Sequence, residues 1–142
     1  MLDYEKIEEF EKQKTKVFKY IMYKKRTEQE IRNKFRGQIH EDMLEDIIEY
    51  LKEAKYIDDY DFVERQVNEY MILKTMSIKE IKYKLYAKGI DKKIIEKYIE
   101  KNYEKLFEYE QKCMQKIREK KSNSMTEQEI NQYLYKKGYK CD

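Results

Sequence analysis

Apolar side chains recur along this sequence three and four residues apart, in five stripes. Two shorter stripes comprise Met43, Leu44, Ile47, Ile48 and Leu51, and Ile94, Ile95, Tyr98 and Ile99. Three longer segments carry Phe10, Val17, Phe18 and Ile21; Val63, Val67, Tyr70 and Met71; and Leu106, Cys113, Met114 and Ile117. Residues at these spacings share one face of an α-helix. We therefore expect each stripe to pack in a helical core, and none indicates a cofactor site.

Three segments of the sequence are copies of one helix start. They begin at Thr27, Ser77 and Thr126, which are 50 and 49 residues apart, and each has a glutamate three residues later. This is the pattern of the capping box, in which the hydroxyl accepts from a free N–H at the helix start and the glutamate reaches back. A constant period indicates an internal repeat.

Glycines predict where the short helices of the repeat end. Gly89 and Gly138 follow the second and third helix starts at the same distance, where a left-handed backbone residue is expected. The first copy differs, because Gly37 comes early and one residue is deleted before Ile39.

Together these patterns predict an all-α protein of tandem three-helix repeats that form an elongated, curved array. Each repeat is expected to have a long, a short and a medium helix. We place the repeats at residues 1–59, 60–103 and 104–142. The third stops at Asp142, just past Gly138, so we expect it to lack its last helix.

Composition supports helices and leaves the partner open. Proline is absent and glycine occurs three times, so tight hairpins have few residues to form them. Lysine and arginine (32) nearly balance aspartate and glutamate (29), and the net charge of +3 is too small to predict a nucleic-acid partner.

The charge is nevertheless unevenly distributed. Residues 27–59 carry 5 basic and 10 acidic side chains, whereas residues 71–103 carry 9 basic and 4 acidic ones. The basic cluster comprises Lys79, Lys82, Lys84, Lys88, Lys92 and Lys93, and a smaller one, including Lys25 and Arg26, ends the first long helix. Such clusters are either solvated helix faces or surfaces that bind phosphates or an acidic protein.

The sequence contains no recognisable catalytic constellation. It has no Gly-rich phosphate loop and no His-based triad, so we expect neither an enzyme nor a cofactor. We expect His40 to be a surface or capping residue, and Asp58 and Asp59 to cap a helix rather than bind metal. Cys113 and Cys141 are too few for a disulfide framework or a zinc site.

No apolar run approaches the length of a membrane span, and the first residues do not resemble a signal peptide. We therefore expect a cytoplasmic protein with reduced thiols and no membrane partner.

The segment around residues 20–62 resembles the RecX family, regulators of the RecA recombinase. The resemblance is carried by Thr27–Ile31, by the run Leu51–Asp59 with its junction Tyr56, Ile57, Asp58, Asp59, and by Phe62. The family's usual glycine before that tyrosine is Lys55 here. The second copy, from Ser77 through Leu85 to Ile90, matches the family's next repeat, and the resemblance extends from about residue 10 to 139.

This resemblance implies tandem three-helix repeats and a non-enzymatic function. Members of the family bind in the groove of the RecA–DNA filament and inhibit its recombinase, ATPase and co-protease activities. By this resemblance the chain would modulate DNA repair, homologous recombination and the SOS response. We expect it to act as a monomer that contacts RecA and the single- or double-stranded DNA within the filament.

Two other functions remain open from the residues alone. The short helix of a repeat, together with the lysines, could serve as the recognition helix of a stand-alone DNA-binding protein. Alternatively, the repeats could be a scaffold that binds an unrelated protein, as helical arrays often do.

Overall fold

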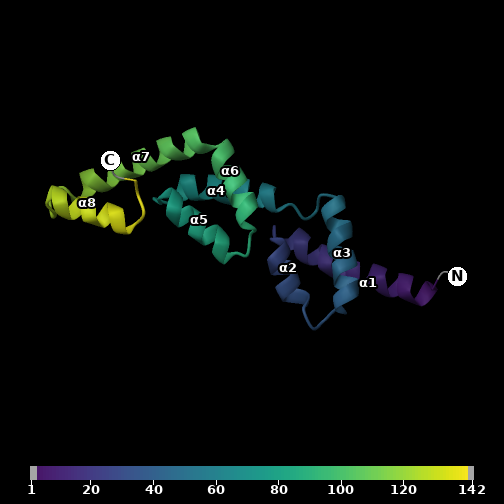
Figure 1. Ribbon diagram of the computed structural model, residues 1–142. Coiled ribbons are helices and arrows are strands. Elements are labelled where there is room, and N and C mark those ends of the chain that lie inside the picture. The colour runs from purple at the N-terminus through teal and green to yellow at the C-terminus, as the bar shows by residue number, and fades with distance from the viewer. Residues whose placement is uncertain (1–2, 141–142) are drawn as a thin grey trace. The chain divides into compact units, whose positions relative to one another are not determined.

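The computed structural model describes residues 3–140, which form eight α-helices (Figure 1). They are α1 (Tyr4–Tyr23), α2 (Glu28–Phe35), α3 (Glu41–Glu53), α4 (Asp59–Leu73), α5 (Ile78–Ala87), α6 (Lys92–Lys101), α7 (Tyr103–Lys121) and α8 (Glu127–Lys136). Residues 3–140 contain no β-strand, so the predicted all-α class is confirmed. Cys141 and Asp142 lie outside the described residues.

All three predicted capping boxes are present. The N–H of Glu30 donates to the Thr27 hydroxyl over 3.0 Å, and that of Glu80 to the Ser77 hydroxyl over 3.1 Å. The corresponding bond from Glu129 to Thr126 is 3.2 Å long. In each box the glutamate side chain also accepts from the N–H of the capping residue. The 49- and 50-residue period of the sequence is therefore a period of helix starts.

The glycines that follow the short helices have the predicted left-handed backbone. The φ angles of Gly37, Gly89 and Gly138 are 83°, 80° and 90°. After α8 the turn closes with N–H bonds from Gly138 to Tyr135 and from Tyr139 to Leu134, each 3.0 Å long. This is the Schellman arrangement, and it turns Tyr139 back into the core.

Helix lengths follow the predicted long, short, medium order in the first repeat but not in the second. There α5 and α6 both have 10 residues. The reason is Asn102, which ends α6 with its side-chain amide bonded to the Tyr98 carbonyl over 2.9 Å. Since α7 begins at the next residue, no room is left for a further turn of α6.

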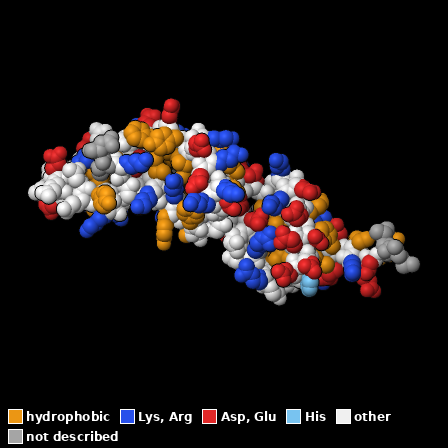
Figure 2. Space-filling view, viewed as in Figure 1, with side chains coloured by type: hydrophobic (Ala, Val, Ile, Leu, Met, Phe, Trp, Pro, Cys, Tyr) orange, Lys and Arg blue, Asp and Glu red, His pale blue; other side chains and the backbone are white. Residues whose placement is uncertain are grey.

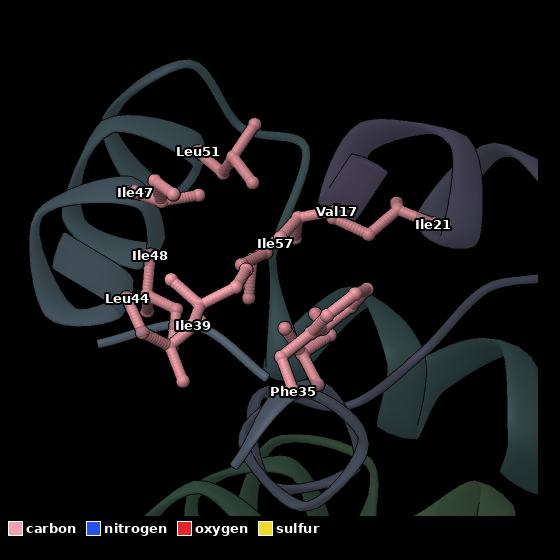
Figure 3. Packing of buried hydrophobic residues seen from close by; sticks show 10 residues of the cluster. Val17, Ile21, Phe35, Ile39, Leu44, Ile47, Ile48, Leu51 and Ile57 are labelled. Atoms are coloured by element: carbon pink, nitrogen blue, oxygen red, sulfur yellow. The ribbon is translucent and has the colours of Figure 1, made fainter. Parts of the chain in front are cut away.

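The chain divides into two compact units, and the division falls inside α4. The first comprises residues 1–62 and 88–90, and the second comprises residues 63–87 and 91–142. In the first unit α1, α2 and α3 pack against one another (Figure 1). Their core, drawn in Figure 3, consists of Val17, Ile21, Ile31, Phe35, Ile39, Leu44, Ile47, Ile48, Leu51 and Ile57. These residues come from the predicted stripes in α1 and α3, from Ile31 and Phe35 of α2, and from the two turns that follow α2 and α3.

In the second unit α7 is the central element, because it packs against α5, α6 and α8. Ile81, Leu85, Ile95 and Leu134 are fully buried there. Cys113 and Met114 of α7 form one cluster with Ile130, Leu134 and Tyr139. Among residues 3–140, no helix has the length and apolarity that crossing a membrane requires.

Candidate functional site

The junction between α3 and α4 is built on a left-handed residue that is not glycine. Lys55 has a φ angle of 67°. The N–H groups of Lys55 and Tyr56 donate to the carbonyls of Lys52 and Leu51, 3.0 and 2.9 Å away, and so complete a Schellman turn. Tyr56 then packs edge-to-face on Phe18 of α1, with ring centroids 5.0 Å apart. The junction thus fixes the chain path out of α3.

The rest of the junction buries its apolar residues and caps two helices with its aspartates. Ile57 and Phe62 are buried. Asp58 precedes α4 and accepts from the N–H of Asp61 over 3.0 Å, so the capping interpretation is confirmed for it. Asp59 instead accepts from the N–H of Glu28, 3.0 Å away, at the start of α2. Asp59 therefore also caps a helix, but that helix is α2 and not α4, the helix that Asp59 begins.

The environment of Asp59 is unusual for a carboxylate. Burial raises the pKa of Asp59, and the negative charges of Glu28 and Asp58 raise this pKa further. The hydrogen bond from the Glu28 N–H and the positive charge of Lys52 lower the pKa and oppose the rise. The side chain is held because it satisfies one of the free N–H groups at the start of α2. The junction thereby joins the beginning of α4 to the beginning of α2 within the first unit.

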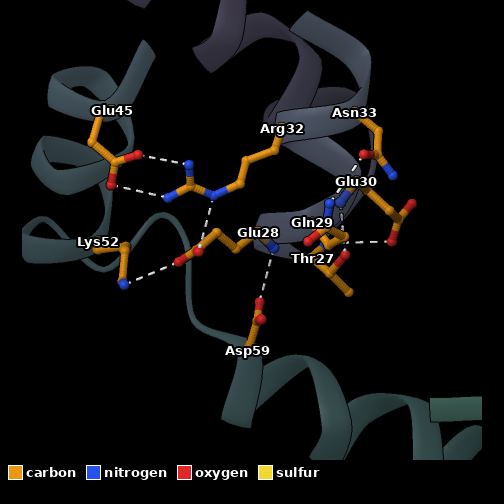
Figure 4. Close-up of polar contacts among 9 residues, drawn as sticks. All are labelled: Thr27, Glu28, Gln29, Glu30, Arg32, Asn33, Glu45, Lys52 and Asp59. Carbon is orange, nitrogen blue, oxygen red and sulfur yellow. Dashed lines mark hydrogen bonds and ion pairs between the residues drawn. The ribbon is translucent and has the colours of Figure 1, made fainter. Parts of the chain in front are cut away.

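Ion pairs continue this connection to α3 (Figure 4). Arg32 of α2 donates from both terminal nitrogens to Glu45 of α3, over 2.6 and 3.0 Å, and from Nε to Glu28 over 3.2 Å. Lys52 contacts Glu28 over 3.0 Å. The hydrogen bond that Arg32 donates lowers the pKa of Glu45, and the hydrogen bond that Lys52 donates to Glu28 raises the pKa of Lys52. These charges are already paired within the unit, which favours a structural role for them.

The two basic residues predicted at the end of α1 are also engaged internally. Lys25 pairs with Asp61 over 2.7 Å. Arg26 lies 4.2 Å over the ring of Tyr20 and 3.8 Å from Glu30. His40 is a helix cap as expected, since its Nδ1 accepts from the N–H of Asp42 over 3.2 Å.

The six lysines predicted as one basic cluster are divided between the two units. Lys88 belongs to the first unit, where it lies 5.7 Å from the Phe62 ring centroid. Lys79, Lys82, Lys84, Lys92 and Lys93 belong to the second unit. There Lys84 lies 5.6 Å from the Tyr70 ring centroid and Lys92 lies 3.8 Å from Glu96. The stem of Lys79 lies against Gly138, where a Cβ atom would come within 2.9 Å of the lysine Cβ.

Sequence reasoning missed a second set of basic residues, on α7. Lys105, Lys112 and Lys116 line a groove of about 550 Å³ together with the end of α4. Lys116 also lines an adjoining hollow of about 280 Å³ whose basic residues include Lys120, Lys121 and Lys137. The spacing of Lys105, Lys112, Lys116 and Lys120 places them along one side of a helix, a signal that was readable in the sequence. Figure 2 shows lysine and arginine side chains exposed over the second unit, and acidic ones gathered near α2 and α3 of the first.

Comparison with known proteins decides the family. The chain is 34% identical over 135 residues to the regulatory protein RecX of Staphylococcus epidermidis, a match that covers 87% of this chain and 48% of that protein. It is 37% identical over 78 residues to the regulatory protein RecX of Finegoldia magna, a match that covers 54% of this chain and 38% of that protein. The crystal structure of RecX from Lactobacillus salivarius superposes with a TM-score of 0.79 at 29% identity, covering 94% of this chain and 90% of that one. The chain belongs to the RecX family.

Other comparisons add the fold and the extent of the match. A second crystal structure of a RecX regulatory protein has a TM-score of 0.75 at 23% identity, covering 99% of this chain and 74% of that chain. No family model matches the sequence. The chain spans less than half the length of the two curated RecX relatives described above. The resemblance carried by the Tyr56–Asp59 junction and the repeated helix starts is thus confirmed at the level of the family.

Proposed function

We propose that this chain binds RecA in the groove of the RecA–DNA filament and inhibits its recombinase, ATPase and co-protease activities. The observation that carries the proposal is the similarity to proteins named regulatory protein RecX, both in sequence and in fold. By this activity the chain would modulate DNA repair and the SOS response. It would act in the cytoplasm, as a monomer and by binding alone.

The structure supports binding rather than chemistry as the means of regulation. The carboxylates that sequence analysis singled out, Asp58 and Asp59, are both occupied as helix caps. Glu28 and Glu45 are held by Arg32 and Lys52. Exposed lysines of the second unit are better placed for intermolecular contact, because their side chains are accessible to a partner. Charges at the edge of an interface contribute mainly to the rate and specificity of association.

The lysines Lys79, Lys82, Lys84, Lys88, Lys92 and Lys93 remain proposed contacts to an acidic protein surface or to phosphate. Among them Lys92 and Lys93 suit a test, because both are exposed at the start of α6. Glutamates are favourable in the first turn of a helix, so replacing these lysines by Glu should not destabilise the fold.

The test is DNA-dependent ATP hydrolysis by RecA from the same source. A several-fold excess of the wild-type chain should lower the rate and shorten the filaments seen by electron microscopy. An unchanged rate together with unchanged filament length would reject the proposal. The variant Lys92→Glu/Lys93→Glu should inhibit less well than a control with the same charge change, Lys12→Glu/Lys16→Glu on α1, if the predicted lysines contribute.

The same material separates RecA binding from stand-alone DNA binding. The binding constant for a bare oligonucleotide is measured as a function of salt concentration. For duplex DNA, each neutralised phosphate lowers the slope of the logarithm of the binding constant against the logarithm of the salt concentration by about 0.9. Tight binding to bare DNA at moderate salt, without any effect on RecA, would favour the DNA-binding alternative. Co-purification of a partner other than RecA, again without effect on RecA, would favour the scaffold alternative.

A further inference from the structure

The groove between the end of α4 and α7 has two chemically different walls, both within the second unit. One wall is the last turn of α4, with Met71, Ile72 and Leu73. The other is the side of α7 that carries Lys105, Lys112 and Lys116. Tyr109 of α7 also lines the groove, and so does Lys74.

The apolar wall is unusually exposed. Ile72 and Leu73 keep 81% and 69% of their surface accessible to solvent, although they are consecutive and lie beside half-buried Met71. Single exposed apolar residues need no explanation, but adjoining ones beside a groove mark an interaction site.

The wall is fixed in place by hydrogen bonds. The Tyr109 hydroxyl donates to the carbonyl of Lys74, which follows α4, and accepts from the N–H of Met76 over 3.2 Å. Lys105 donates to Asn68 of α4 over 2.9 Å. Because these bonds hold the last turn of α4 to α7, Ile72 and Leu73 are presented to solvent on an ordered helix end.

The opposite wall is strongly basic. The groove is lined by four lysines and one glutamate, Glu108, which lies 3.5 Å from Lys112. Lys112 and Lys116 are one helical turn apart, a separation of roughly 6 Å along the axis. Among residues 3–140, Lys116 has no ion-pair partner, and through it the basic surface continues into the adjoining hollow.

We infer that this groove binds an acidic amphipathic segment of a protein partner. The apolar side of such a segment would cover Ile72 and Leu73, and its carboxylates would face Lys112 and Lys116. This combination distinguishes a protein from a nucleic acid, because a phosphate backbone would pair with the lysines but leave the apolar wall uncovered. The inference rests on the proposed function and assigns a surface to it.

The direct test uses the full chain and a synthetic helical peptide with a leucine stripe flanked by glutamates. A scrambled peptide of the same composition and a single-stranded oligonucleotide serve as the other probes. The wild-type chain should bind the helical peptide more tightly than the scrambled one. Lys112→Glu/Lys116→Glu should weaken that binding roughly tenfold or more, since two favourable charge pairs become repulsive.

Two further variants test the apolar wall by itself and the effect of changing the net charge elsewhere on the chain. Ile72→Ser/Leu73→Ser should also weaken peptide binding, with an unchanged thermal unfolding curve because both side chains are exposed. Lys12→Glu/Lys16→Glu, with the same spacing and charge change on exposed α1 positions, should bind the peptide like the wild type. Equal peptide binding by the wild type and the α7 variant would overturn the inference. The inference would also be overturned if the oligonucleotide bound to the wild-type chain in place of the peptide and if the α7 variant lost that binding.

Inhibition of RecA distinguishes failure of the groove from failure of the proposed function. If the groove is used, Lys112→Glu/Lys116→Glu should lose inhibition that Lys12→Glu/Lys16→Glu retains. Full inhibition by the α7 variant would reject the groove and leave the proposed function intact. Absence of inhibition by the wild type would reject the proposed function, while peptide binding would still report on the groove.

Discussion

The hydroxyl of Ser77 donates a hydrogen bond to the backbone carbonyl of Lys137, 2.6 Å away. The same hydroxyl accepts from the N–H of Glu80 and so caps α5. One buried oxygen therefore closes the start of α5 and also binds the carbonyl just before Gly138, after α8. The side chain joins two short helices of successive repeats in the second unit.

An equivalent contact occurs in the first unit. Thr27 caps α2 and its hydroxyl donates to the carbonyl of Lys88 over 3.3 Å, just before Gly89. Thr126 has the same capping box on α8, but it is exposed, and no such second bond is formed by it within residues 3–140. A hydroxyl is thus needed as a donor at two of the three helix starts and as a cap at all of them.

Substitutions at Ser77 should separate capping from donation. Ser77→Ala removes both bonds and should lower the free energy of unfolding by about 2 kcal/mol. Ser77→Asp keeps a good cap but cannot donate when ionised, and it places a carboxylate against the Lys137 carbonyl. We expect it to be at least as destabilising, as measured by urea denaturation.

Thr126 supplies the matched control for this prediction. Thr126→Asp should leave stability within about 0.5 kcal/mol of the wild type, because aspartate caps as well as threonine at an exposed position. A Ser77→Asp variant as stable as the wild type would show that donation to Lys137 contributes nothing.

The glycine after each short helix should differ in its tolerance of a side chain. Gly138→Ala places a Cβ atom 2.9 Å from the Lys79 Cβ and 3.1 Å from the Ser77 Oγ. We expect a cost of about 1–2 kcal/mol from the left-handed backbone and roughly 1–3 kcal/mol more from the overlap. Gly37→Ala meets nothing within 4 Å, so it should incur only the backbone cost.

Differential scanning calorimetry of the two variants gives the comparison. The melting temperature should fall clearly further for Gly138→Ala than for Gly37→Ala. Equal decreases would mean that the loop after α8 moves away from Ser77 and Lys79 without penalty.

Lys55 offers the opposite case, because here a residue with a Cβ occupies a left-handed position. Its φ angle of 67° is one that glycine adopts without strain. Lys55→Gly should therefore raise the free energy of unfolding by about 0.5–1 kcal/mol, after allowing for the greater freedom of glycine in the unfolded chain. Lys55→Ala keeps the Cβ atom and should give no gain. A destabilised Lys55→Gly variant would indicate that the lysine stem makes contacts that outweigh the strain.

Local features of this fold were predictable from the sequence because they depend on neighbouring residues. A capping box needs only residues three apart, and a left-handed turn needs only a glycine at the helix end. The apolar stripes likewise predicted the buried helix faces that carry Val17 and Ile47. The repeat period supported the three capping predictions together, because Thr27, Ser77 and Thr126 occupy equivalent positions of the repeat.

Contacts between distant residues were not predictable in the same way. Asp59 was expected to cap the helix that it begins, but its carboxylate binds the N–H of Glu28, 31 residues earlier. The lysines of α7 were passed over because local charge counts favoured residues 71–103. Only the fold brings these lysines to the same groove as Ile72 and Leu73.

Glu110 of α7 is a buried carboxylate with an unusual titration. It is 1% exposed and accepts from the N–H of Lys140 over 3.3 Å. Burial raises its pKa above the usual 4.5, and hydrogen bonds from the Lys140 and Ile78 N–H groups oppose that rise only in part. The folded chain therefore binds this proton more tightly than the unfolded chain does.

This raised pKa predicts a pH-dependent effect of Glu110→Gln. A carboxyl group with a raised folded pKa favours the folded state most below pH 4.5, and this advantage is lost as the pH rises through the raised value. Glutamine still accepts from the Lys140 N–H and has no charge to bury. The variant should therefore gain stability relative to the wild type as the pH rises from 4.5 to 8, measured by chemical denaturation. Glu64→Gln, at an exposed position of α4, should show a nearly constant difference. A constant difference for Glu110→Gln as well would mean that the carboxylate is ionised without penalty in the folded chain.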